Sequence, residues 1–191
     1  YNHDHTNPNS LSEDIIFDFS EDEMGNLWIL TGNKGFDYLM VNEEKFIHMA
    51  NMLPPDYKFP DDRVFFIHQD KQNNLWVGAR GKVHCFKIGY NENGIPKLHP
   101  IKIENQIIKS AALSIKEVDD GSIWIGTAGE GLLKFDRTHN TLKKFEVRDN
   151  NSALKSMAIL AIEEDQTGDL WIGGNPFENN FISRAGAPAG L

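Results

Sequence analysis

Short runs of alternating apolar and polar residues recur along this chain, separated by segments rich in Asp, Asn and Gly. In four copies, an alternating run leads through such a segment into an apolar run with a tryptophan at its centre. The tryptophans are Trp28, Trp76, Trp124 and Trp171, so the copies lie 48, 48 and 47 residues apart. A fixed period in this range is typical of a repeat protein, in which each unit needs a neighbour to bury its apolar face.

Each copy has the pattern of three or four short antiparallel strands. Apolar residues nine and eleven positions before each tryptophan predict a first strand with one buried face. These pairs are Phe19 and Phe17, Ile67 and Phe65, Ile115 and Leu113, and Ile162 and Leu160. The turn residues predict a hairpin into the tryptophan strand, and one or two weaker alternating runs follow. No stretch has the 3.6-residue period of an amphipathic helix.

These strands predict an all-β fold of β-propeller blades, about four repeats of roughly 48 residues each. We expect the array to cover residues 1–183. Residues 184–191 are expected to be a linker or an expression remnant, because this small-residue stretch breaks the repeat. A large flat side chain repeated once per blade suits a sheet-on-sheet interface, so we expect every tryptophan to be buried between blades. The Asp and Gly turns are expected to be exposed on one common face.

The repeated phrase carries a family resemblance. The first copy has Glu21 and Asp22 before Gly25-Asn26-Leu27-Trp28, the fourth has Glu164 and Asp165 before Gly168-Asp169-Leu170-Trp171, and the third continues as Trp124-Ile125-Gly126-Thr127 and Gly131-Leu132-Leu133-Lys134-Phe135-Asp136. This form resembles the repeat of the two-component regulator propeller family. Departures are Leu30 for the motif Gly, Asn73 for the first-turn Gly and Val118 for the Asp.

The resemblance implies a ring of about seven blades, of which this chain would be a part. It implies the periplasmic input region of an inner-membrane hybrid two-component sensor histidine kinase that responds to an oligosaccharide, without catalysis in this segment. A homodimer or other self-association is expected. The chain begins without Met or a leader segment, so we expect it to be a piece of a longer protein. Alternatives are a dimerisation scaffold that does not bind the sugar, and a propeller enzyme acting on polysaccharides.

Composition narrows the function classes. The net charge of −9 argues against nucleic acid, whose binding needs a basic face. No apolar run is long enough to span a membrane. A single cysteine, Cys85, excludes an intrachain disulfide and a Cys-based zinc site. We expect no metal, because Asp22 with Asn26 and Asp165 with Asp169 fit hairpin turns better than calcium loops. No phosphate loop, nucleophile elbow or single-blade catalytic set is found, so no cofactor is expected.

Binding residues are expected where the copies differ, on the loops around the axis. Aromatic faces suit sugar rings, and Arg or Lys suits acidic substituents. The candidates are Tyr57, Arg63, Arg80, Lys82, Lys109 and Glu130, with Lys58, Phe59 and Lys155 in the same loops. Each of them taken singly also fits a solvated loop residue.

Overall fold

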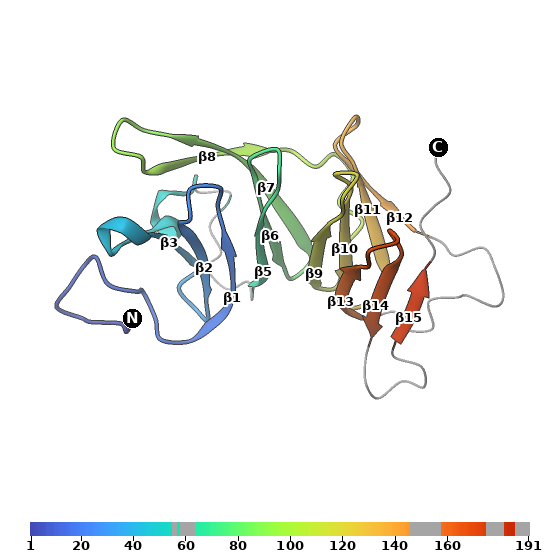
Figure 1. The fold of residues 1–191 in the computed structure, drawn as a ribbon, viewed down its shortest axis with the longest axis horizontal. Helices are drawn as coiled ribbons and strands as arrows, with labels where there is room; N and C mark the ends of the chain where they lie inside the picture. Colours follow the sequence, from blue (N-terminus) through green and yellow to red (C-terminus); the bar gives the residue numbers. More distant parts are fainter. Residues whose placement is uncertain (55–56, 58–63, 146–157, 175–181, 186–191) are drawn as a thin grey trace. The chain divides into compact units, whose positions relative to one another are not determined.

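The computed structural model describes residues 1–54, 57, 64–145, 158–174 and 182–185, with only the backbone of Ala50 and of residues 182–185. The described chain consists of strands and turns with two short helices, which confirms the predicted all-β fold (Figure 1). The strands are β1 (Ile16–Glu21), β2 (Leu27–Thr31), β3 (Phe36–Met40), β4 (Lys45–His48), β5 (Val64–Gln69), β6 (Asn74–Ala79), β7 (Lys82–Tyr90), β8 (Pro96–Ile101), β9 (Ala112–Glu117), β10 (Ile123–Thr127), β11 (Leu132–Asp136), β12 (Thr141–Lys144), β13 (Ile159–Glu164), β14 (Leu170–Gly174) and β15 (Ile182–Ala185). The 3-10 helices η1 (Val41–Glu43) and η2 (Met49–Met52) flank β4. Neither helix is long or apolar enough to cross a membrane.

Four sheets form within the described residues, in the strand orders β1-β2-β3-β4, β5-β6-β7-β8, β12-β11-β10-β9 and β13-β14-β15. Each sheet is one repeat with the form of a propeller blade, because the tryptophan always lies on its second strand. The chain divides into two compact units, of which unit 1 comprises Tyr1–Ala79 and His84–Ile101, and unit 2 comprises Arg80–Val83 and Lys102–Leu191. Unit 1 thus contains the β1–β4 blade and most of the β5–β8 blade, and unit 2 contains the β9–β12 and β13–β15 blades.

The first hairpin of each blade turns on a residue with positive φ, three positions before the tryptophan. These residues are Gly25 (φ 80°), Asn73 (60°), Gly121 (80°) and Gly168 (82°). Asn tolerates this region, so the departure at Asn73 leaves the turn intact. Asp22 Oδ1 accepts hydrogen bonds from the Met24 and Asn26 amides at 2.8 Å, which confirms the hairpin interpretation. We expected these turns to be exposed, and this was wrong for Asp22 and Asp70, whose side chains are buried. Asp70, like Asp22, accepts hydrogen bonds from amides of its own turn.

A β-bulge in the first strand changes which residues face the neighbouring blade. The register shifts between Ile16 and Asp18 in β1, and at the equivalent places in β5 and β13. In β5, Val64 and Ile67, twelve and nine positions before the tryptophan, are therefore buried together. In β13, Leu160 at the eleventh position is 49% exposed. The prediction that positions nine and eleven share the buried face was wrong, because an extra residue resets the alternation.

The blade interface of unit 1 is built around Trp28. This side chain is fully buried in one apolar cluster with Ile67, Leu75 and Val77 of the following blade. Its indole N–H donates to Gln69 Oε1 at 2.6 Å, also in that blade. The predicted position of the tryptophan between two blades is therefore confirmed in unit 1.

Unit 2 repeats this arrangement around Trp124, which lies in one buried cluster with Leu170 and Ile172 of the β13–β15 blade. Trp76 is fully buried as well. The expectation that all four tryptophans are buried was wrong for Trp171, which is 43% exposed. The local phrase around Trp171 matches the other three, so its exposure reflects what packs against it and not the sequence nearby.

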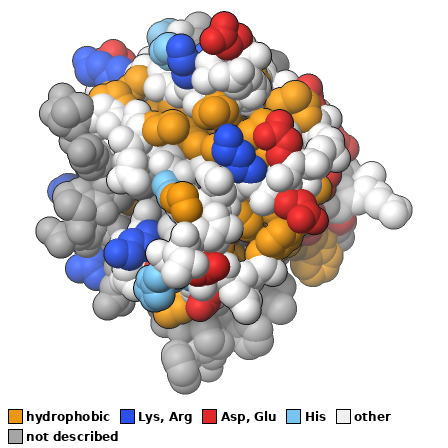
Figure 2. Space-filling view, turned by 90° about the vertical axis from the view of Figure 1, so that its left-hand side faces the viewer, with side chains coloured by type: hydrophobic (Ala, Val, Ile, Leu, Met, Phe, Trp, Pro, Cys, Tyr) orange, Lys and Arg blue, Asp and Glu red, His pale blue; other side chains and the backbone are white. Residues whose placement is uncertain are grey.

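The face of the β1–β4 blade opposite to Trp28 is apolar and partly exposed to solvent (Figure 2). Leu11 of the N-terminal segment packs there with Ile29, Leu39 and Phe46, and covers part of the face. Beside this cover lies a slot of about 260 Å³, lined by Tyr1, Leu11, Ile16, Phe19, Leu27, Ile29, Leu39 and Phe46.

Candidate functional site

Three segments of unit 2, residues 80–82, 109–111 and 127–131, lie side by side and are here named the loop cluster. Arg80 pairs with Ala111 in an isolated antiparallel bridge, and the Gly81 N–H donates to the Ser110 carbonyl. On the other side, the Ala128 N–H donates to the Ala111 carbonyl at 2.8 Å. The middle segment is therefore hydrogen-bonded on both sides. Four predicted binding residues come together in this way: Arg80, Lys82, Lys109 and Glu130.

Glu130 binds the backbone of the middle segment. Its carboxylate accepts hydrogen bonds from the Lys109 amide at 3.0 Å, from the Ser110 amide at 3.2 Å and from the Ser110 hydroxyl at 2.6 Å. Burial alone would raise the pKa of this carboxyl, but the hydrogen bonds from Ser110 and Lys109 outweigh it and hold the pKa below its usual range. Glu130 thus fixes the backbone that carries Lys109.

Three cationic side chains stand on the loop cluster. Arg80 and Lys109 are exposed, and Lys82 is half-buried at the start of β7. The Thr127 hydroxyl also stabilises the backbone of the loop cluster, because it donates a hydrogen bond to the Gly131 carbonyl at 2.9 Å. A guanidinium can bind a carboxylate or sulfate through two parallel hydrogen bonds, and an ammonium adds a point charge. The cluster can therefore hold an anionic ligand on a fixed backbone.

The structure does not place Tyr57 or Arg63 relative to this group. Tyr57 belongs to unit 1, where its ring packs against His84 and Phe86 with ring centroids 5.8 and 5.6 Å apart. Much of its aromatic surface is thus used in packing, which the sequence did not indicate. Arg63 lies outside the described residues, as do Lys58, Phe59 and Lys155.

A groove of about 500 Å³ in unit 2 was not predicted. It is lined by Trp124 and Phe145 together with charged groups that include Lys134, Asp136 and Lys143. Lys134 Nζ lies 5.2 Å from the centre of the Trp124 ring, and Lys143 Nζ lies 2.6 Å from Asp136 Oδ2. The sequence signal for this groove is the replacement of apolar residues by lysines on β11 and β12.

A further difference near Trp124 is the departure at Val118. In the second and fourth blades, the indole N–H of Trp76 and of Trp171 donates at 2.8 Å to the Asp six positions earlier. Val118 stands at that position before Trp124 and cannot accept a hydrogen bond. Trp124 therefore lacks the acceptor that Trp76 and Trp171 use.

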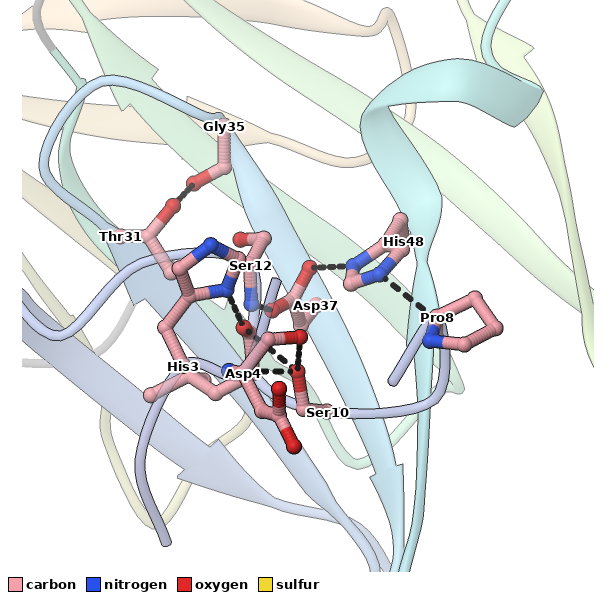
Figure 3. Close-up of polar contacts among 10 residues, drawn as sticks. His3, Asp4, Pro8, Ser10, Ser12, Thr31, Gly35, Asp37 and His48 are labelled. Atoms are coloured by element: carbon pink, nitrogen blue, oxygen red, sulfur yellow. Dashed lines mark hydrogen bonds and ion pairs between the residues drawn. The ribbon is translucent and has the colours of Figure 1, made fainter. Parts of the chain in front are cut away.

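The pair of Asp37 and His48 in unit 1 has the composition of a catalytic dyad but is fully engaged in holding the N-terminal segment (Figure 3). His48 Nδ1 lies 3.0 Å from Asp37 Oδ1, and its Nε2 lies 3.0 Å from the Pro8 carbonyl oxygen. The second carboxylate oxygen of Asp37 accepts the Ser12 amide at 2.7 Å. Since both ring nitrogens are occupied, His48 has no nitrogen left to act as a general base here.

Comparisons with known proteins show which family these repeats are similar to. Residues 58–81 and 153–175 match the model of the two component regulator propeller family, which confirms the resemblance seen in the sequence. A comparison with curated proteins finds no match.

Solved structures similar to this chain include the WD40 beta propeller domain of Doa1, with a TM-score of 0.59 and 12% identity over 88% of this chain and 49% of its own. The extracellular domain of a hybrid two component system from B. thetaiotaomicron is similar over 94% of this chain and 22% of its own length, with a TM-score of 0.68 and 17% identity. A second such domain from that organism covers 96% of this chain and 28% of its own, with a TM-score of 0.54 and 20% identity. Virginiamycin B lyase from Staphylococcus aureus covers 95% and 59%, with a TM-score of 0.59 and 16% identity. The chain thus spans about a quarter of the two extracellular domains, and these similarities support the propeller fold.

Proposed function

We propose that this chain is a non-catalytic, ligand-sensing segment of an extracytoplasmic propeller in a hybrid two-component sensor. The observation that carries the proposal is the match of two repeats to the two component regulator propeller family. The similar domains from B. thetaiotaomicron are extracellular parts of hybrid two component systems, which supports the same location for this chain. In that role the segment lies in the periplasm, and the inner-membrane anchor and the histidine kinase belong to other parts of a longer protein.

The ligand in this proposal is an oligosaccharide with acidic groups, bound at the loop cluster. The exposed cations Arg80 and Lys109 and the half-buried Lys82 stand on a backbone that the Glu130 hydrogen bonds hold in place. A preorganised base lowers the entropy lost on binding, and paired N–H donors suit carboxylate or sulfate groups on a sugar. In a chain with a net charge of −9, such a group of cations favours an acidic ligand over a neutral one.

Calorimetric titration of the chain with acidic and neutral oligosaccharides tests this proposal. We expect the acidic sugars to bind more tightly, and Arg80→Ala, Lys82→Ala and Lys109→Ala each to weaken binding by about tenfold, which corresponds to 1.4 kcal/mol. Lys97→Ala, which removes an exposed cation from β8 in unit 1, is the matched control and should leave affinity unchanged. Blades beyond this chain would contribute further contacts, so the complete propeller is expected to bind more tightly.

Other outcomes separate the alternatives. Binding that survives all three loop-cluster substitutions but is lost in Lys134→Ala would move the site to the groove. Binding of a protein partner without any sugar would favour the dimerisation scaffold, for which the exposed apolar face of the β1–β4 blade is the supporting observation. Turnover of an oligosaccharide by the purified chain would favour the enzyme alternative.

A further inference from the structure

In unit 1, side-chain hydrogen bonds connect the groups around the Trp28 indole N–H. The N–H donates to Gln69 Oε1 of the following blade at 2.6 Å, and Gln69 Nε2 donates to Asn73 Oδ1 at 3.0 Å. Beside the Trp28 ring, Tyr38 donates to Asp22 Oδ2 at 2.6 Å. The Trp28 N–H is therefore satisfied by the protein itself.

Unit 2 has different residues at the four places around its tryptophan. Counted from each tryptophan, the pairs of equivalent residues are Asp22 and Val118, Tyr38 and Lys134, Gln69 and Glu164, and Asn73 and Gly168. Val118 cannot accept a hydrogen bond, and Gly168 has no side chain. Glu164 can accept, but its Oε2 binds the Asp119 amide at 2.7 Å. The hydrogen-bonded arrangement of unit 1 is thus not repeated in unit 2.

A cavity of about 240 Å³ lies where these residues stand, between the β9–β12 and β13–β15 blades. The two blades lie side by side in unit 2 (Figure 1). We name this space the junction cavity, and its lining includes all four unit 2 residues of these pairs, together with Trp124, Asp119 and Asp120. Both blades contribute to the lining, so the cavity is formed inside the repeat array.

The Trp124 indole N–H is a buried donor at the junction cavity. Trp124 is 2% exposed, and no residue in the described part of the chain accepts a hydrogen bond from its N–H. In the other three blades this N–H donates to the residue six before its own tryptophan or seven before the next one. Those positions are Val118 and Glu164 in unit 2, and both line the cavity, so the N–H faces it. A buried indole N–H without an acceptor costs free energy, which favours a ligand that supplies one.

The charges around the junction cavity favour a neutral ligand. Asp119, Asp120 and Glu164 bring three carboxylates, which repel an anion. Lys134 Nζ lies 5.2 Å from the centre of the Trp124 ring and repels a cation, which could not accept from the N–H in any case. A hydroxyl group can accept from the Trp124 N–H and donate to a carboxylate at the same time. Glu164 retains acceptor capacity for it, because a carboxylate accepts more hydrogen bonds than the single one from Asp119.

We propose that the junction cavity binds a neutral polyhydroxyl compound of the size of one sugar ring. The Trp124 N–H donates to one ligand hydroxyl, and Glu164 accepts from that hydroxyl or its neighbour. At roughly 30 Å³ per water molecule the cavity has room for about eight waters, and such a ligand replaces them with hydroxyls that form the same kinds of hydrogen bond. The lining shares no residue with the loop cluster, so this is a second site with a different ligand preference.

Nuclear magnetic resonance of the nitrogen-15-labelled chain tests the proposal, because each tryptophan gives one indole N–H signal. Glucose, galactose and xylose serve as neutral probes, with glucuronate and glucosamine as the anionic and cationic counterparts. We expect a neutral sugar to shift the Trp124 signal, assigned with Trp124→Phe, in a saturable way with a dissociation constant in the millimolar range. The charged analogues should bind more weakly. The signals of Trp28, Trp76 and Trp171 should stay in place, because these N–H groups donate within the protein.

Three substitutions make the test specific to the junction cavity. Val118→Asp supplies the acceptor found at this position in the second and fourth blades, so it should keep the circular dichroism spectrum and weaken sugar binding about tenfold or more. Glu164→Gln keeps an acceptor for the Asp119 amide but removes the charge, and should weaken binding about fivefold. Lys102→Ala changes an exposed cation of unit 2 outside the cavity and should leave affinity unchanged.

The proposal is overturned if no neutral sugar shifts the Trp124 signal through the millimolar range. Tighter binding of glucuronate or glucosamine than of the neutral sugars would contradict the charge argument and overturn it as well. Sugar binding that is undiminished in folded Val118→Asp and in Glu164→Gln would show that the Trp124 N–H and Glu164 do not hold the ligand.

Discussion

The blade interfaces of units 1 and 2 are alike at the first two strands of each blade, here called the inner half. They differ at the third and fourth strands, the outer half. In both units a buried tryptophan packs with four apolar residues of the next blade, which are Val64, Ile67, Leu75 and Val77 in unit 1 and Ile159, Ile162, Leu170 and Ile172 in unit 2. Further out, the residue paired with the tryptophan on the third strand is Tyr38 in unit 1 and Lys134 in unit 2. On the fourth strand the equivalent residues are Ile47 and Lys143. The side chains of the inner half are therefore of the same type in both units, whereas those of the outer half differ in type.

These differences decide how each outer half is held. In unit 1, Tyr38 is fully buried, donates a hydrogen bond to Asp22 Oδ2 at 2.6 Å and accepts one from Asn26 Nδ2 at 2.9 Å. In unit 2, Lys134 lies over the Trp124 ring at the groove. Apolar packing thus extends through the interface of unit 1, while charged groups at the groove replace it in unit 2. Neighbouring sheets meet most closely at the first two strands of each blade. At these strands the repeat keeps the same kinds of side chain in both units.

The loops after the tryptophan strands show a second contrast. In unit 1, the carboxylate of Glu13, before the first strand, accepts hydrogen bonds from the Asn33 amide and side chain at 2.6 and 2.9 Å. In unit 2, Lys109 stands at the position of Glu13, and the carboxylate comes from Glu130 in the loop instead. In both units a carboxylate joins the segment before the first strand to the loop after the tryptophan strand. The carboxylate belongs to the segment before the first strand in unit 1 and to the loop in unit 2. The exchange leaves an exposed cation at Lys109, which the proposed binding site uses.

The largest expected effect tests the shared inner half. Trp28→Ala and Trp124→Ala should each lower the free energy of unfolding by about 3 to 5 kcal/mol, because each ring fills a buried cluster. Trp171→Ala should cost less than about 1 kcal/mol, since this ring is partly in solvent. Urea titrations followed by circular dichroism measure all three. A loss under about 1 kcal/mol for Trp124→Ala would contradict the central role of the tryptophan.

A smaller effect tests the contrast between the outer halves. Tyr38→Ala should cost roughly 3 kcal/mol, because it removes a buried ring and the hydroxyl that donates a hydrogen bond to Asp22 Oδ2. Lys134→Ala should cost about 1 kcal/mol, the range expected of a partly exposed cation over an aromatic ring. Equal losses in the same urea titrations would show that the two outer halves do not differ in the way their contacts suggest.

The smallest effect concerns pH and the two loop carboxylates. Hydrogen bonds from the side chain and amide of Asn33 lower the pKa of Glu13, and those from Ser110 and Lys109 lower that of Glu130 in spite of burial. A lowered pKa in the folded state means that the stabilisation is present above the unfolded pKa and is lost as the pH falls through the folded pKa. Because both groups are near solvent, each contributes at most about 1 kcal/mol. Glu13→Gln and Glu130→Gln should each reduce the loss of stability on acidification below about pH 4.5, measured by thermal unfolding. An unchanged pH profile in both variants would contradict the linkage.

The period of the sequence by itself determined the strands, the hairpin turns and the second-strand position of the tryptophan in every blade. These features depend on local chemistry, namely alternation over a few residues and turn residues able to adopt positive φ. The cations Arg80, Lys82 and Lys109 could be named as candidates from the sequence, since they stand in or beside loops where the copies differ. The bond from Glu130 to the Lys109 segment joins residues far apart in sequence, so no local pattern revealed it.

Only the tertiary structure decided which side chains these strands bury. A single bulge moved the buried pair from positions nine and eleven to positions nine and twelve, and Tyr57 proved to pack against His84 and Phe86. Trp28 and Trp171 stand in nearly the same phrase, yet one is fully buried and the other is 43% exposed. Burial depends on the sheet that packs against a residue, and a repeated sequence specifies the same face in every blade without specifying what covers it.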